Sequence, residues 1–137
     1  MAVVAYIGPN TVKISSTALE GITGIFINYE QNLHDAITVD GKSYSDVVVV
    51  GSQKVSVEVT GIDRESLTTL ISTATGSVDM TFKVGVNETA SEKTITLKSP
   101  CGFVWTSGLN TQKDTVAEFA VKGYCIPASD ADPVSVA

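Results

Sequence analysis

The sequence predicts a mainly β protein, an antiparallel β-sandwich or half-barrel with one flanking α-helix at about residues 64–75. Charged residues make up only 18% of the chain, and Val, Thr, Ser, Ile and Gly fill much of the rest, a composition that favours strands and turns. Several segments alternate apolar and polar residues, as half-buried strands do, and only one has helical spacing. At 137 residues we expect a single domain, residues 1–137.

The strand and helix over residues 54–76 are the centre of this prediction. Apolar residues occupy every second position of the strand and are expected to face the core: Val55, Val57 and Val59. The other face is polar and expected to be wet: Ser56, Glu58 and Thr60. Gly61 then ends the strand, Asp63 is suited to accept backbone N–H groups at a helix start, and Gly76 ends the helical run. The helix presents a candidate core face at helical spacing: Leu67, Leu70 and Ile71.

The sequence of the N-terminal third predicts an arm, two strands and a hairpin. Residues 1–9 are apolar and end in Gly-Pro, so we expect an arm that docks on its own domain or on a neighbour. Strands are expected from Val12 and over residues 25–30. Asp40-Gly41 is the dipeptide best suited to a tight hairpin between 36–39 and 42–44.

The uninterrupted apolar run 47–50 is either a strand covered on both faces or one whose second face is buried only on assembly, and we expect monomer core. A turn is expected at Gly51–Gln53.

The C-terminal half predicts four more strands and a second arm. The strands are expected at residues 78–86, 94–98, 101–105 and 115–123, with polar loops at 87–93 and 106–114. Gly123 is expected to close the last strand. Residues 127–137 carry Pro and Asp among small residues and are expected to form a flexible or partner-ordered arm.

Charge and motifs restrict the functional classes. The net charge of -6 argues against gripping nucleic acid through its phosphates. The first residues lack the basic start of a signal peptide and the length of a membrane anchor. Cys101 and Cys125 do not form a CxxC pair, and free thiols in a reducing cytosol are favoured over a disulfide.

We expect no catalytic, cofactor-binding or metal-binding residues. The lone histidine, His34, is expected in a surface turn, and neither a nucleophile elbow nor a phosphate-binding loop is present. The sequence therefore favours a protein that is not an enzyme and needs no cofactor, with a small hydrolase as the minority alternative.

The order of these segments resembles bacteriophage tail tube (major tail) proteins and the related tubes of contractile injection systems. The resemblance runs from Val12 to Ile126: two strands, an Asp-Gly hairpin, a Val-rich strand, Val-Ser-Val-Glu-Val-Thr-Gly, a lone helix over 63–74, and the closing Ala-Glu-Phe-Ala-Val-Lys-Gly at 117–123. It is a resemblance of pattern and order, without a signature motif.

This resemblance implies a structural virion protein of the phage tail, made in the host cytoplasm. Identical copies would form hexameric rings that stack into a tube for DNA passage. The expected partners are other copies of the chain and sheath, tape-measure, baseplate and terminator or neck proteins. A polar sheet face would line the lumen without binding DNA, and its candidate acidic residues are Glu58, Asp79 and Glu118. We expect arms 1–9 and 127–137 to support oligomerisation.

Two alternatives remain open from sequence. The chain could be another virion β protein, for head decoration or tail completion. It could also be a monomeric β-sandwich that binds carbohydrate or protein through Trp105 with Tyr44 or Tyr124, although core aromatics are the favoured interpretation.

Overall fold

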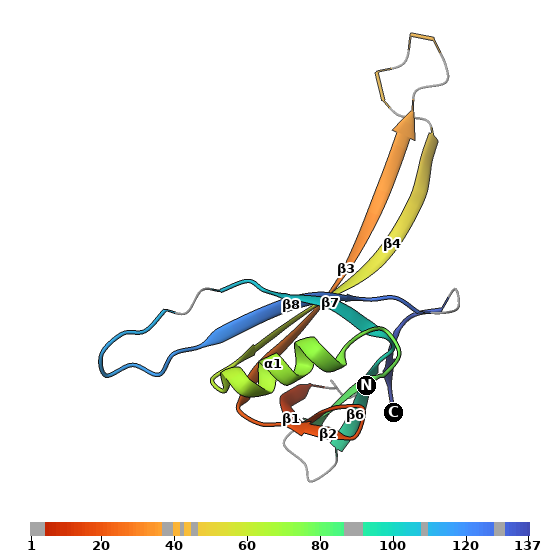
Figure 1. Cartoon of the computed structure of the whole chain (residues 1–137). Coiled ribbons are helices and arrows are strands. Elements are labelled where there is room, and N and C mark those ends of the chain that lie inside the picture. Colours follow the sequence, from red (N-terminus) through yellow and green to blue (C-terminus); the bar gives the residue numbers. More distant parts are fainter. Residues whose placement is uncertain are drawn as a thin grey trace.

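The structure, a computed structural model, confirms a mainly β chain with two antiparallel sheets and one helix (Figure 1). It describes residues 5–36, 40–41, 43–44, 47–86, 92–107, 110–127 and 131–137. The two sheets enclose one hydrophobic core, and the predicted antiparallel β-sandwich with a flanking helix is therefore confirmed.

The five-stranded sheet has the order β2-β1-β5-β6-β9. Its strands are β1 (Tyr6–Ile14), β2 (Thr17–Leu19), β5 (Met80–Val86), β6 (Glu92–Leu97) and β9 (Val134–Val136). The alternation expected over 78–86 is present, with Met80, Phe82 and Val84 buried. The strand begins only at Met80, because residues 75–79 first connect it to the helix. This sheet supplies one wall of the core.

The four-stranded sheet has the order β3-β4-β8-β7. Its strands are β3 (Ile22–Ala36), β4 (Val47–Gly61), β7 (Pro100–Trp105) and β8 (Phe119–Cys125). Val55, Val57 and Val59 are at most 5% exposed, which confirms them as core. The wet position expected for Ser56 is wrong, because Ser56 is only 1% exposed and its hydroxyl donates to the Asn28 carbonyl oxygen at 3.5 Å.

The helix α1 (Arg64–Thr73) packs beside β7, β8, β2 and β4 (Figure 1). Asp63 is the N-cap, and its side chain accepts a hydrogen bond from the Glu65 N–H at 3.1 Å. Leu67 and Leu70 are fully buried, and Ile71 is half-buried against the same core. The helix ends at Thr73, two residues before the predicted bound of 75, because Ala74 is its C-cap.

The two segments expected as arms contribute strands to the chain's own sheet. Residues 6–9 belong to β1, which pairs with β5 from Tyr6 onward, so this strand begins well before the predicted Val12. Residues 134–136 form β9 on the edge of β6, and Pro133 is buried. A partner-ordered or flexible C-terminal arm is therefore wrong for 131–137, since β6 supplies the partner that the local sequence lacks.

The hairpin between β3 and β4 differs most from expectation. The strand β4 runs through the turn predicted at Gly51–Gln53, because a register shift opposite Gln31–Leu33 absorbs those residues as a bulge. Asp40-Gly41 does form a turn, with Gly41 at a φ of 84°, but the described flanking strands end at Ala36 and restart at Val47. The predicted 37–39 part of the hairpin and Lys42 lie outside the described residues.

Two smaller expectations near β8 are also corrected. The strand runs over Phe119–Cys125 rather than 115–123, so Gly123 lies inside it. Gly123 is needed there because a Cβ would stand 2.7 Å from the Cys101 carbonyl oxygen and 2.8 Å from the Phe103 ring. Both cysteines are free thiols, as the sequence favoured, with Cys125 buried and Cys101 half-buried.

Candidate assembly surfaces

A two-stranded ribbon, defined here as residues 31–36 of β3 with 47–53 of β4, projects from the sandwich (Figure 1). Within it the two strands pair with each other, whereas β8 joins β4 only from Val55 onward. A two-stranded hairpin without further cover is only marginally stable in water. The ribbon therefore has less internal support than the part of β4 that pairs with both β3 and β8.

The ribbon exposes apolar side chains beside polar ones. Leu33 and Val48 are each 62% exposed, and Tyr44 near its tip is 85% exposed. The expectation that the run 47–50 belongs to the monomer core is wrong for its described side chains, because Val47 and Val48 are both exposed. The second sequence alternative, burial only on assembly, is the one that remains.

The four-stranded sheet has two edge strands, β3 and β7. No described strand pairs with the outer edge of β3, and the outer edge of β7 meets a single bridge between Thr75 and Cys101. An uncovered edge offers free backbone N–H and C=O groups to another strand. Both sides of the four-stranded sheet could therefore accept a neighbouring chain.

We define the outer face as the side of the four-stranded sheet that points away from the core. The register places these described side chains on it: Phe26, Asn28, Glu30, Lys54, Ser56, Glu58, Val104, Lys122 and Tyr124. Glu30 and Lys54 form an ion pair at 3.3 Å, and Glu58 lies directly opposite Lys122. The lysine Nζ atoms lie 4.9 Å (Lys54) and 6.0 Å (Lys122) from the centre of the Tyr124 ring.

The structure separates the three acidic residues proposed for the lumen. Glu58 lies mid-strand in β4 on the outer face, as predicted. Asp79 instead precedes β5 in the other sheet, where it forms an ion pair with Lys98 at 3.3 Å and accepts a hydrogen bond from the Ser99 N–H. Glu118 is exposed just before β8 and lines a hollow of the 110–117 loop. The mid-strand positions expected for Asp79 and Glu118 are wrong, because both strands begin one residue later.

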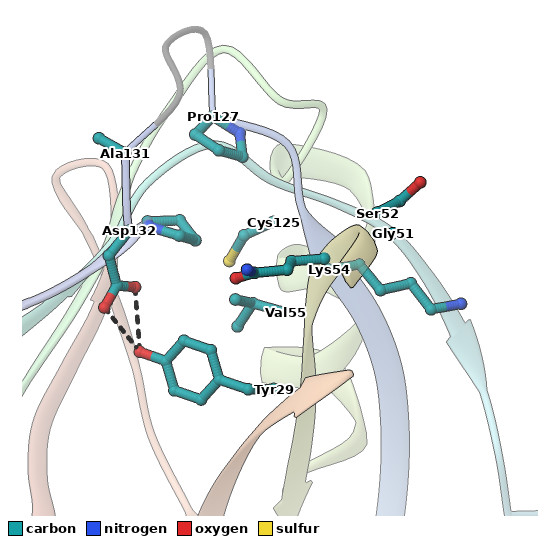
Figure 2. A pocket seen from close by; sticks show the side chains of 11 residues that line it. Tyr29, Gly51, Ser52, Lys54, Val55, Cys125, Pro127, Ala131 and Asp132 are labelled. Atoms are coloured by element: carbon teal, nitrogen blue, oxygen red, sulfur yellow. Dashed lines mark hydrogen bonds between the residues drawn. The ribbon is translucent and has the colours of Figure 1, made fainter. Parts of the chain in front are cut away.

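A hollow of about 450 Å³ lies at the base of the ribbon, next to the C-terminal segment (Figure 2). The Tyr29 hydroxyl lies 3.0 Å from both carboxylate oxygens of Asp132, to which it donates, and the Cys125 thiol faces the same space. Burial, followed by the hydrogen bond and the charge of Asp132, raises the pKa of Tyr29. Burial also raises the pKa of Cys125 to about 11, with smaller contributions from Cys101 and Asp79, so this thiol is protonated at neutral pH.

The aromatic residues considered for a binding module do not gather. Trp105 is half-buried, meets Phe119 edge-on at 6.4 Å between ring centres, and lies under the Arg64 guanidinium at 4.6 Å. Tyr124 is on the outer face, and Tyr44 is near the ribbon tip. A shared aromatic binding surface is not formed by these three side chains.

The described residues show no group of three or more His, Cys, Asp or Glu that could hold a metal ion. His34 is exposed as predicted, but in strand β3 rather than in a turn. None of the described helices is long and apolar enough to cross a membrane. The features that stand out are therefore surfaces: the ribbon, the open edges and the outer face.

Comparison with protein-family models gave no match for this chain, and comparison with curated protein sequences gave none either. The resemblance to tail tube proteins therefore rests on the order of the segments in the sequence alone.

Sequence reasoning missed the ribbon and the link between Tyr29 and Asp132. The run 47–50 carried a signal for the ribbon, since four apolar residues without polar alternation require cover on both faces. The hydrogen bond joins residues that are 103 positions apart, so a local sequence pattern does not predict it.

Proposed function

We propose that this chain is a structural virion protein, the subunit of a bacteriophage tail tube that forms stacked hexameric rings around a channel for DNA. The observation that carries the proposal is the ribbon, whose exposed apolar side chains Leu33, Val47 and Val48 lack cover from the described part of their own chain. Another copy would supply that cover, and burying side chains such as Leu33 and Val48 contributes about 1.5–3 kcal/mol each.

Closed symmetry accounts for the open edges as well. A ring of identical copies pairs the same two surfaces repeatedly, so each uncovered edge of the four-stranded sheet meets a neighbour and no edge remains to recruit further chains. The lone helix and the sandwich fit the tube-protein pattern implied by the sequence. The sheath, tape-measure, baseplate and neck or terminator proteins expected as partners belong to this proposal too.

The test is electron microscopy of the purified full-length protein together with its mass in solution. We expect rings or tubes for the wild type, and loss of assembly in L33S/V48S. The control is Ile62→Ser, which also removes an exposed apolar side chain but from the sandwich, and which should assemble normally.

The alternatives give different results in the same experiment. A monomeric mass for the wild type would contradict the tube and favour a binding module. Small closed oligomers without stacking would favour a head-decoration or tail-completion protein. Normal tubes from L33S/V48S would show that the ribbon is not the assembly surface.

A further inference from the structure

We propose that the outer face is a charge-balanced track for DNA, on which Glu30 and Glu58 keep Lys54 and Lys122 from gripping phosphate. This inference rests on the proposed function, because it assigns the outer face to the lumen. It replaces the polar face with acidic residues that the sequence predicts for the lumen by a face of paired charges.

The outer face carries equal numbers of acidic and basic side chains among its described residues. Its described residues include two carboxylates, Glu30 and Glu58, and two amines, Lys54 and Lys122, so their formal charges sum to zero. The whole chain, in contrast, has a net charge of -6. The outer face is thus less acidic than the rest of the protein.

Both lysines of the outer face lie beside a carboxylate and near the Tyr124 ring. Lys54 is held from two sides, by the Glu30 carboxylate at 3.3 Å and by the Tyr124 ring at 4.9 Å. Lys122 shares that ring at 6.0 Å and lies directly across from Glu58, at a pairing position where Cβ atoms are about 4.5–5.5 Å apart. Each amine therefore has a carboxylate as its cross-strand neighbour.

Pairing with a carboxylate weakens the attraction between each lysine and a DNA phosphate. An amine next to a carboxylate acts on a distant phosphate as a small dipole, and salt screens its field within about 8–10 Å. A free amine would instead release counterions from DNA and bind it. Balanced pairs provide a wetted surface that neither repels the DNA strongly nor holds it, which suits transit.

The experiment removes the carboxylates and keeps the side-chain shape. The full-length double variant E30Q/E58Q is titrated with a fluorescent duplex of mixed sequence, and its assembly state is recorded by electron microscopy. We expect the wild type not to bind, and E30Q/E58Q to bind with an affinity that falls about tenfold between 50 and 200 mM salt, as two phosphate contacts require.

The matched control is E20Q/E92Q. It changes the net charge by the same two units, but Glu20 and Glu92 are exposed residues outside the four-stranded sheet. This control should not bind the duplex. Adding K54Q and K122Q to E30Q/E58Q should abolish the binding again.

Two results would overturn the track: no binding by E30Q/E58Q, or equal binding by E20Q/E92Q. Tube assembly is read separately in every sample. Tubes without induced binding would reject this inference and leave the tube function standing. Induced binding by a protein that never assembles would support the balanced pairs and reject the tube.

Discussion

The two ends of strand β4 differ in their burial, although valine dominates both. Val55, Val57 and Val59 are at most 5% exposed, whereas Val47 and Val48 are 37% and 62% exposed. The difference arises from the neighbours, since β8 and the five-stranded sheet cover only the end that follows Gln53. A valine-rich run thus specifies a strand, and the surrounding elements decide whether it becomes core.

The sandwich and the ribbon also contribute differently to the stability of the folded subunit. The sandwich buries its apolar residues within one chain, so its stability is a property of the subunit. The ribbon exposes Leu33, Val47 and Val48, so these side chains add little to the stability of the subunit. Substitutions in the two regions should therefore affect different measurements.

The largest effect is expected from Leu70→Ala in the helix. Leu70 is fully buried, and such truncations cost about 2–5 kcal/mol of unfolding free energy. Urea denaturation followed by circular dichroism measures the loss. Thr68→Ala, at an exposed position of the same helix, is the control and should change stability by less than about 0.5 kcal/mol. A Leu70→Ala loss as small as the control's would mean that the helix is not part of the core.

Gly123→Ala should have the next largest effect, about 1–3 kcal/mol. Its methyl group would stand 2.7 Å from the Cys101 carbonyl oxygen, and backbone cannot move aside as a flexible side chain can. The control is Gly85→Ala, where the methyl group meets only the Ile7 carbonyl oxygen at 3.6 Å. If both variants unfold at the same denaturant concentration, the close packing of β7 on β8 is wrong.

Stability should fall as the pH rises from about 9 toward 11. Burial raises the pKa of Cys125 to about 11 from an ordinary value of 9.0, so the folded chain keeps a proton that the unfolded chain releases. Stability is therefore full below pH 9, and the loss at pH 10 is about 1 kcal/mol. Unfolding free energies at pH 7 and 10 measure it.

Cys125→Ala should remove most of this pH dependence, and Cys101→Ala serves as its control. The raised pKa of Tyr29 acts in the same direction at still higher pH, so the comparison stops at pH 10. A pH dependence unchanged in Cys125→Ala would contradict the assignment.

The smallest effect on subunit stability is expected in the ribbon. L33S/V48S should change the unfolding free energy of the isolated subunit by less than about 0.5 kcal/mol, because both side chains are exposed there. The same variant should lose assembly. A subunit destabilised by 2 kcal/mol or more, on the order of a core truncation, would show that the ribbon packs on its own sandwich and would remove the contrast between the two regions.

The alternation of residues along the strands predicted only part of the outer face. Period-two alternation predicted that Glu58 lies on the polar side of β4, since successive side chains in a strand point to opposite faces. It failed for Asp79 and Glu118, because the two strands were predicted to begin at residues 78 and 115 but begin at Met80 and Phe119, which leaves both acidic residues just outside them. Lys122 as the neighbour of Glu58 was unpredictable, since it requires the register between β4 and β8.

The sequence by itself determined the fold class, the helix with its Asp63 cap and its Leu67 and Leu70 core face, and the buried valines of β4. These features follow from spacing over a few residues, which the chain carries locally. Tertiary structure alone decided which strands lie side by side, that β9 closes the β6 edge, and that Val47 and Val48 lie beyond the part of β4 that β8 covers. Those outcomes depend on contacts between residues far apart in the sequence, and the spacing of residues within one segment does not determine which distant strand it pairs with.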